Sequence, residues 1–235
     1  MATSSWRSRP FSSRSHAVRA AGALLCWLLA GAVSAQAAEA LSGDGQWHLR
    51  SLDGPPVGLQ LLDGRGVIVR SYVARSLAGA VASGVELIVA NPARRAFVIA
   101  FAGLDELWDL SLDPGAEPIF NGWVHDYRMG EGVAEPGHLG VRRVKLPAPL
   151  LSLAIDASGA YVLGRAHDLA DGRAVLHLLQ LDVRRSIARF EVDADPDLSQ
   201  ARSDRVGDQP LLVIPDRRGG APLRLDLRAA RLQPG

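Results

Sequence analysis

The residues best suited to chemistry lie between Gly122 and Gly137, in the run GWVHDYRMGEGVAEPG. His125 is followed directly by Asp126, and Arg128 comes three residues after the histidine. An adjacent carboxylate can orient an imidazole and raise its basicity, which helps both metal ligation and proton transfer. Four glycines in this run disfavour a regular helix and predict a loop. The alternative interpretation is a solvated loop between strands, whose histidine and arginine only cap turns.

The segments on both sides of this loop predict strands, because they are apolar and rich in β-forming residues. Short apolar runs of the same kind continue along the chain, and turn signals such as Asp63-Gly64 and Asp171-Gly172 separate them. The predicted strands are Gln46–Leu52, Gly58–Leu62, Gly66–Tyr72, Val85–Ala90, Ala96–Phe101, Glu106–Leu112, Pro118–Val124, Val141–Leu146, Leu151–Ile155, Ala160–Leu163, Val175–Asp182, Ile187–Val192, Leu211–Ile214 and Leu223–Leu227. The Ala-rich stretch Arg75–Ser83 fits a short helix or a strand equally well.

Internal similarity favours a propeller over a sandwich or a barrel. The segment Glu86–Asp113 resembles Ser152–Val183, since each has three apolar strands separated by polar turns. Partial copies start at Val57 and Pro210, and Trp108-Asp109 falls near the end of a third strand, as in WD repeats. We therefore predict an all-β protein, a partial β-propeller of about four four-stranded antiparallel blades.

The first 37 residues predict a secretory signal peptide. A basic start with four arginines and no acid precedes the apolar run Ala20–Ala32 and an A-x-A cleavage site ending at Ala37. The apolar run is shorter than the roughly 20 residues of a membrane span, although a retained anchor stays an alternative. We expect cleavage after Ala37, a periplasmic location, and a propeller domain over residues 38–235. The single cysteine, Cys26, lies in the signal, so disulfides and covalent haem attachment are not expected.

The charge of the mature chain points away from nucleic acids. Removing the four signal arginines changes the formal net charge from +1 to −3, and a mildly acidic protein is poorly suited to bind phosphate backbones. No membrane partner is expected after cleavage. The acidic run Asp193–Asp197 offers oxygens to calcium but lacks the glycine and glutamate of a calcium loop, so a flexible acidic loop is the preferred interpretation.

The run Arg94–Leu146 resembles the d1-haem β-propeller domain of cytochrome cd1 nitrite reductases, including the NirF-like and NirN-like relatives of haem d1 biosynthesis. The resemblance rests on Glu106-Leu107-Trp108, the run from Gly122 to Arg128, Pro136-Gly137, Arg142-Arg143 and the later run from Leu181 to Arg185. The propeller of that family has eight blades, whereas this chain has length for about four. The resemblance therefore implies a shortened relative, or a ring that two chains complete as a homodimer.

The resemblance also implies non-covalent binding of haem d1 or a precursor of it. Such a macrocycle needs an imidazole for the iron, arginines for its carboxylates and aromatic faces for the ring. The implied cofactor-binding residues are Trp123, His125, Tyr127, Arg128, His138, Arg142 and Arg143. His125 is the implied metal ligand, and His125 with Asp126 the implied catalytic pair. Alternatives stay open for some of these residues: His138 can be an exposed loop residue, and Arg184-Arg185 and Arg217-Arg218 can be solvated turn charges. The other histidines have no partner at metal-ligand spacing and are taken as structural, namely His48, His167 and His177.

Two functions from different classes follow. The first is an exported binding protein for a d1-type tetrapyrrole, related to haem d1 biosynthesis or nitrite-reductase maturation and partnered by the proteins of that process. The second is a non-catalytic periplasmic β-propeller interaction module without a cofactor.

Overall fold

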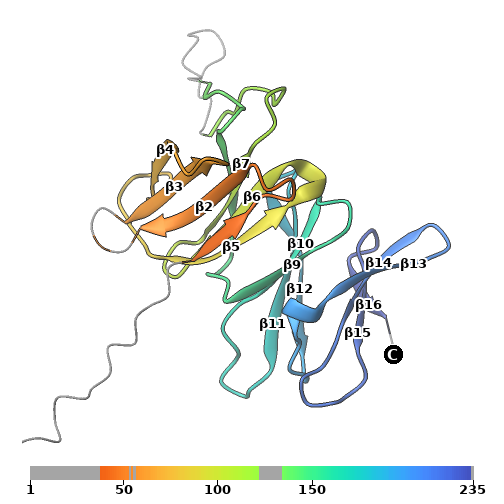
Figure 1. Ribbon diagram of the computed structural model, residues 1–235. Coiled ribbons are helices and arrows are strands. Elements are labelled where there is room, and N and C mark those ends of the chain that lie inside the picture. The colour runs from red at the N-terminus through yellow and green to blue at the C-terminus, as the bar shows by residue number, and fades with distance from the viewer. Residues whose placement is uncertain (1–37, 53, 55–56, 122–133, 234–235) are drawn as a thin grey trace, which may run out of the picture. The chain divides into compact units, whose positions relative to one another are not determined.

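The computed structural model describes residues 38–52, 54, 57–121 and 134–233, and these fold almost entirely into β-strands (Figure 1). Sixteen strands form four sheets of four, and each sheet joins its strands in chain order. Two short 3-10 turns, Pro92–Arg94 and Leu198–Gln200, are the helical elements of the described residues. None of the described helices is long and apolar enough to cross a membrane. The prediction of an all-β protein with four four-stranded antiparallel blades is confirmed.

The strand bounds show one antiparallel meander per sheet. The first sheet contains β1 (Glu39–Leu41), β2 (Trp47–Leu52), β3 (Gly58–Asp63) and β4 (Ile68–Val73). The second contains β5 (Val85–Asn91), β6 (Ala96–Phe101), β7 (Glu106–Ser111) and β8 (Val141–Lys145). The third contains β9 (Ser152–Ile155), β10 (Tyr161–Arg165), β11 (Ala174–Gln180) and β12 (Arg185–Val192). The fourth contains β13 (Arg202–Val206), β14 (Gln209–Ile214), β15 (Leu223–Asp226) and β16 (Arg231–Gln233).

Consecutive sheets share hydrophobic cores, and the alternation of side chains along each strand divides the residues between them. On β6, Phe97, Ile99 and Phe101 pack into a core shared with the first sheet. Val98 and Ala100 of the same strand pack into a second core shared with the third sheet. A third core joins the third and fourth sheets. Because both of their faces are covered, β6 and β7 are buried at every position.

Strands with a strong apolar pattern lie where the sequence predicts them, and Ala96–Phe101 has identical bounds. Three further strands were not predicted. β13 reads RSDRV and is exposed at all five positions, so it lacks an apolar pattern, while β1 and β16 have only three residues each. The first and last sheets therefore begin earlier than the predicted copies at Val57 and Pro210.

The prediction of a strand over Pro118–Val124 is wrong within the part that the structure describes. Ile119 forms only an isolated bridge with Glu135, and residues 122–124 lie outside the described residues. The stretch Arg75–Ser83 is neither helix nor strand, and it contains a single bridge between Arg75 and Ala82. The backbone of Ser111 holds both ends of the long connection from β7 to β8, through hydrogen bonds with Leu139 (2.9 Å) and Gly140 (3.0 Å).

Candidate functional site

The residues of the predicted site fall into two groups. Those in the first group lie outside the described residues: Trp123, His125, Asp126, Tyr127 and Arg128. The second group is described, and its members are His138, Arg142 and Arg143. The roles assigned to the first group therefore stay predictions.

His138 lies in the connection between β7 and β8 and packs edge-on against Trp47 of β2. The ring centroids are 6.5 Å apart and the ring planes are inclined by 71°. The Nδ1 atom of His138 is buried and has no hydrogen-bond partner among the described residues. No ion pair or hydrogen bond of the described residues joins His138 to Arg142 or Arg143. Its role in cofactor binding stays a prediction.

Arg143 fastens the connection between the first two sheets onto β7. It lies opposite Trp108 in the strand register, and its guanidinium carbon is 4.6 Å from the centroid of the indole. Its Nη1 donates to Glu106 Oε2 at 2.8 Å and to the Arg75 carbonyl at 2.7 Å. The other oxygen of Glu106 accepts the N–H of Leu77 at 2.7 Å. These contacts hold Arg143 on the face of β7 that packs towards the first sheet, and its role in cofactor binding stays a prediction.

Arg142 points to the opposite face and belongs to a cluster of charges around Asp109. Asp109 follows Trp108 on β7, so its side chain faces the third sheet, where it is 1% exposed. Its Oδ2 lies 3.6 Å from Arg94 Nη2 and 3.9 Å from Arg142 Nη1. Neither carboxylate oxygen has a hydrogen-bond partner within the described part of the chain. We call Arg94, Arg142 and Arg184, together with Asp109, the arginine cluster.

The positive charges of the arginine cluster are not all paired with carboxylates. Burial raises the pKa of Asp109 above its ordinary value, although Arg94 and Arg142 oppose this shift. Burial and the nearby charge of Arg142 lower the pKa of the Arg184 guanidinium, against the effect of Asp109. Arg94 also pairs with Asp182 at 2.6 Å, whereas Arg184 has no ion pair among residues 38–121 and 134–233 that the structure describes. Three cations thus face two carboxylates, and an added anion would relieve the repulsion between Arg142 and Arg184.

The arginine cluster adjoins the point at which the chain enters the Gly122–Gly137 run. Arg184 Nη1 donates to the carbonyl of Phe120 at 3.0 Å. Asn121 Nδ2 donates to the carbonyl of Val141, the neighbour of Arg142, at 2.6 Å. The last described residue before the predicted site residues is therefore attached to β8. The sequence signal that could have found this cluster is Asp109, an acid in the middle of a buried strand and opposite Arg142.

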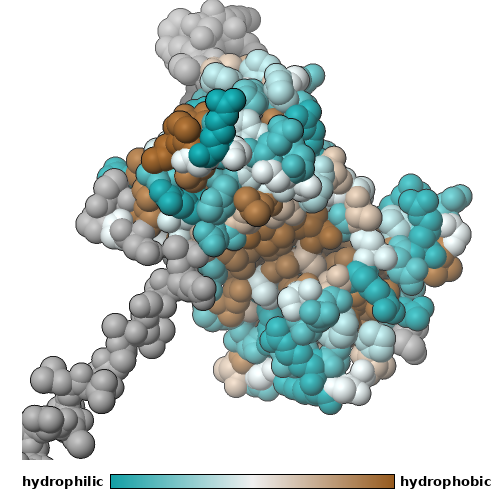
Figure 2. All heavy atoms as spheres, viewed as in Figure 1, coloured by the Kyte–Doolittle hydropathy of each residue, from teal (hydrophilic) through white to brown (hydrophobic). Residues whose placement is uncertain are grey.

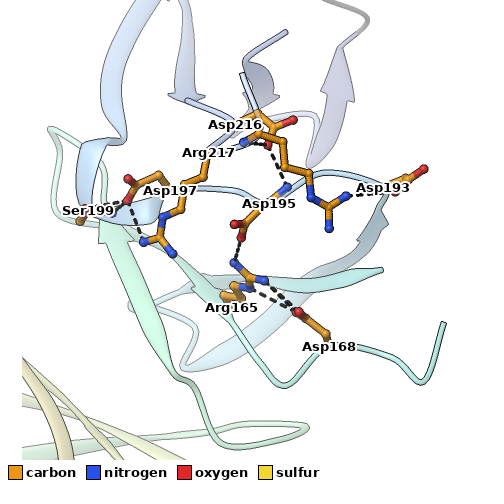
Figure 3. Close-up of polar contacts among 9 residues, drawn as sticks. Arg165, Asp168, Asp193, Asp195, Asp197, Ser199, Asp216 and Arg217 are labelled. Atoms are coloured by element: carbon orange, nitrogen blue, oxygen red, sulfur yellow. Dashed lines mark hydrogen bonds and ion pairs between the residues drawn. The ribbon is translucent and has the colours of Figure 1, made fainter. Parts of the chain in front are cut away.

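A second group of charges holds the Asp193–Asp197 segment, which connects the third sheet to the fourth (Figure 3). Arg165 of β10 donates from Nη1 to Asp195 at 2.5 Å and from Nη2 to Asp168 at 2.9 and 3.0 Å. The N–H of Asp195 donates to Asp216 Oδ1 at 3.0 Å, so the segment is attached to both sheets.

The predicted flexible acidic loop is therefore an anchored connection. Arg217 pairs with Asp197 at 3.2 Å and Arg218 with Asp193 at 3.4 Å, and both arginines are about half exposed. Hydrogen bonds from Arg217 and Ser199 lower the pKa of Asp197 to about 2. Within the described ranges no group of three or more His, Cys, Asp or Glu side chains has the geometry of a metal site.

Two surface cavities are lined by residues that do not belong to the arginine cluster. One of about 310 Å³ is lined by Ser42, Gly43, Asp44, Asn91, Pro92, Arg95, Ala96 and Leu112. Another of about 610 Å³ lies between the third and fourth sheets and includes Asp156, Tyr161, Asp204, Arg205, Asp208 and Arg228 in its lining. The geometry offers the arginine cluster as a site for anions.

Comparison with known proteins rests on structure alone. No family model matches the sequence, and no curated protein matches it. NirN, described as a dihydro-heme d1 dehydrogenase in complex with DHE, matches with a TM-score of 0.62 and 21% identity. The match covers 83% of this chain and 36% of NirN, so the chain spans about a third of that protein.

Two further solved structures are similar at lower scores. Apo AztD from Citrobacter koseri has 12% identity and a TM-score of 0.49, over 84% of this chain and 45% of that one. The β-propeller domain of Cps50 (Swd1) from Myceliophteria thermophila has 12% identity and a TM-score of 0.47, over 77% and 50%. With its four antiparallel meanders and the similarity to NirN, the chain has a β-propeller fold.

Proposed function

We propose that this protein binds a d1-type haem, or a precursor of it, non-covalently at the arginine cluster and the adjoining Gly122–Gly137 run. The observation that carries the proposal is Arg184, a partly buried arginine that lies beside Arg142 without a carboxylate of its own in the described structure. The resemblance to the d1-haem family and the structural similarity to NirN support the choice of ligand.

The residues present fit the carboxylate fringe of a tetrapyrrole. A ligand carboxylate between Arg142 and Arg184 would gain charge-assisted hydrogen bonds, each contributing about 1.5–3 kcal/mol. It would also replace like-charge repulsion by attraction, because the pKa of Arg184 is lowered in part by Arg142. Asp109, whose pKa burial raises, would keep these arginines oriented towards the entry of the Gly122–Gly137 run.

The remaining contacts are assigned from the sequence. Trp123 and Tyr127 would pack on the macrocycle, Arg128 would bind a further carboxylate, and His125 would ligate the iron with its ring oriented by Asp126. When bound, the iron macrocycle would supply redox chemistry. With the predicted signal peptide, we infer a periplasmic role in haem d1 biosynthesis or nitrite-reductase maturation.

The direct test is an absorption titration of the purified protein with haem d1 extracted from a cytochrome cd1 nitrite reductase. Arg142→Gln and Arg184→Gln should each weaken binding roughly ten- to hundredfold, the equivalent of one charge-assisted hydrogen bond. Arg224→Gln is the matched control, because Arg224 is an exposed arginine of β15. Its affinity should equal that of the parent.

A second pair of variants tests the iron ligand. His125→Ala should shift the visible spectrum and lower the affinity, while His138→Ala should leave the spectrum unchanged. If the parent protein does not bind haem d1, the tetrapyrrole proposal fails and the interaction-module function takes its place.

A further inference from the structure

The outer edge of the first sheet carries a concentration of exposed apolar side chains. Val67, Ile68, Val69 and Val73 are each about half exposed, at 57%, 48%, 46% and 51%. Val67 directly precedes β4 and the other three belong to it, and within the described residues β4 pairs with β3 alone. Figure 2 shows apolar side chains, in brown, gathered at the end of the molecule where β4 lies in Figure 1.

The other outer strands are protected by charge, and β4 is not. β8 reads VRRVK, β12 reads RSIARFEV and β16 reads RLQ, so each has charged side chains along a short or strongly polar edge. β4 reads IVRSYV, with Arg70 as its single charge. Charged residues on an edge strand discourage pairing with another chain. β4 is therefore the outer edge most open to strand pairing among those described.

The hydrogen bonding of β4 determines which backbone groups face outward. Ala74 donates its N–H to the carbonyl of Val57 at 3.0 Å, on the β3 side of the strand. Because bonding alternates along an antiparallel strand, the N–H groups of Val73 and Ser71 point away from β3. A β-bulge next to Val69 ends the regular register there. The edge that another strand can pair with is centred on Ser71.

We propose that β4 is a self-association edge, where two copies of this chain pair their β4 strands antiparallel about a two-fold axis through Ser71. This axis pairs the outward backbone groups of Ser71 with each other, and it sets Val69 opposite Val73 and Arg70 opposite Tyr72. Within one chain the Arg70 guanidinium carbon already lies 5.2 Å from the centroid of the Tyr72 ring, so the cross-strand pair is compatible with their chemistry. The two sheets become one continuous sheet across the axis.

The register is selected by charge. In an antiparallel pair related by a two-fold axis, opposite residues share one face of the sheet, so the axis must pass through a residue. Moving the axis by one residue to Arg70 places two arginines opposite each other, which is destabilising. A second copy paired through Ser71 avoids this contact.

The broad outward face of the first sheet is a poorer surface for a second copy. Leu49 and Leu61 face the core shared with the second sheet, so their neighbours His48 and Arg50 face outward. His48 pairs with Glu39 at 3.2 Å, and Arg50 donates to Gln60 at 2.8 Å. Covering this face would remove charged and polar groups from water, which costs free energy. Pairing at the edge leaves them solvated.

Ser71→Pro tests the proposal with little expected effect on a single chain. Proline lacks the N–H, but the N–H of Ser71 faces outward, and proline is tolerated on edge strands in that orientation. Ser71→Ala keeps the N–H and is the matched control. Val69→Lys adds an edge charge and serves as a second, independent variant. Sedimentation of the purified chain across micromolar concentrations measures the state of each, and circular dichroism checks that each is folded.

The parent protein and Ser71→Ala should sediment as dimers. Ser71→Pro and Val69→Lys should dissociate at least about tenfold more readily, the equivalent of losing roughly 1.4 kcal/mol of pairing free energy. A monomeric parent protein overturns the proposal. A dimer of unchanged affinity in either folded variant also overturns it, because the contact then lies elsewhere. If Ser71→Pro does not fold, Val69→Lys decides the question.

Discussion

The attachment of the Asp193–Asp197 segment to the third sheet depends on one side chain, that of Arg165. Its guanidinium bonds to Asp195 and, through two nitrogens, to Asp168 (Figure 3). The change Arg165→Met keeps most of the apolar stem and removes the charge and every donor. It leaves Asp195 without its cation, close to Asp216. We expect this single change to lower the free energy of unfolding and to loosen the fourth sheet in particular.

The size of the effect follows from the exposure of each pair. The Arg165 side chain is 15% exposed and that of Asp195 is 30% exposed, so their bond is partly shielded from water. A charge-assisted hydrogen bond of this kind contributes about 1.5–3 kcal/mol. Asp168 is 40% exposed, and an exposed pair contributes at most about 1 kcal/mol. Together the loss should be about 2–3 kcal/mol.

Urea unfolding of Arg165→Met, followed by far-ultraviolet circular dichroism, measures this loss. Arg189→Met is the control, because Arg189 is about half exposed on β12 and its ion pair in the described part of the chain is with Glu191 of the same strand. Its cost should stay below about 1 kcal/mol. Relative to the parent protein, Arg165→Met should show a larger increase in the rate of hydrogen exchange in β13–β16 than in β2 and β3. An Arg165→Met protein as stable as the Arg189→Met control would refute the reasoning.

Three further changes probe other parts of the structure. Asp109→Asn removes a carboxylate whose pKa burial raises. The parent should therefore lose stability relative to this variant as pH rises from about 4 through the folded-state pKa, and melting temperatures at pH 4 and pH 8 measure this difference. Gly164→Ala places a methyl group against Leu150, 2.8 Å from Cδ2, and overpacking should cost about 1–3 kcal/mol in urea unfolding unless the leucine shifts freely. Tyr72→Phe removes the hydroxyl that donates to the Leu139 carbonyl at 2.8 Å, and a loss of about 1 kcal/mol is expected by the same assay, with no change contradicting a role for this bond.

The four-sheet architecture could be predicted because its inner strands carry an unambiguous signal. β6 and β7 are covered on both faces, so they read as continuous apolar runs between turn residues. β13 gives no such signal, because every one of its side chains is exposed and polar or small apart from Val206. Because β1 was not predicted from the sequence, the partner of His48 was not found either, since Glu39 lies on that strand.

The arginine cluster could not be predicted as a unit, because its members come from three distant segments. Arg94 follows β5, Arg142 lies on β8 and Arg184 lies between β11 and β12. Only the packing of the second sheet on the third brings them to Asp109. By contrast, the opposite orientations of Arg142 and Arg143 follow from strand alternation alone, once β8 is recognised.

The two ends of the β7–β8 connection are joined to each other, and this affects how such a protein can change over evolutionary time. Ser111, Leu139 and Gly140 join the two ends of the connection by backbone hydrogen bonds, so the strands beneath do not depend on the length of chain between them. Each doubling of a flexible loop costs only about 0.6 kcal/mol of closure entropy. Insertions and deletions at this position should therefore change the free energy of unfolding of the four-sheet scaffold only slightly. New ligand preferences can arise there by exchange of one segment, and a laboratory library confined to it should yield folded variants more often than one spread over the strands.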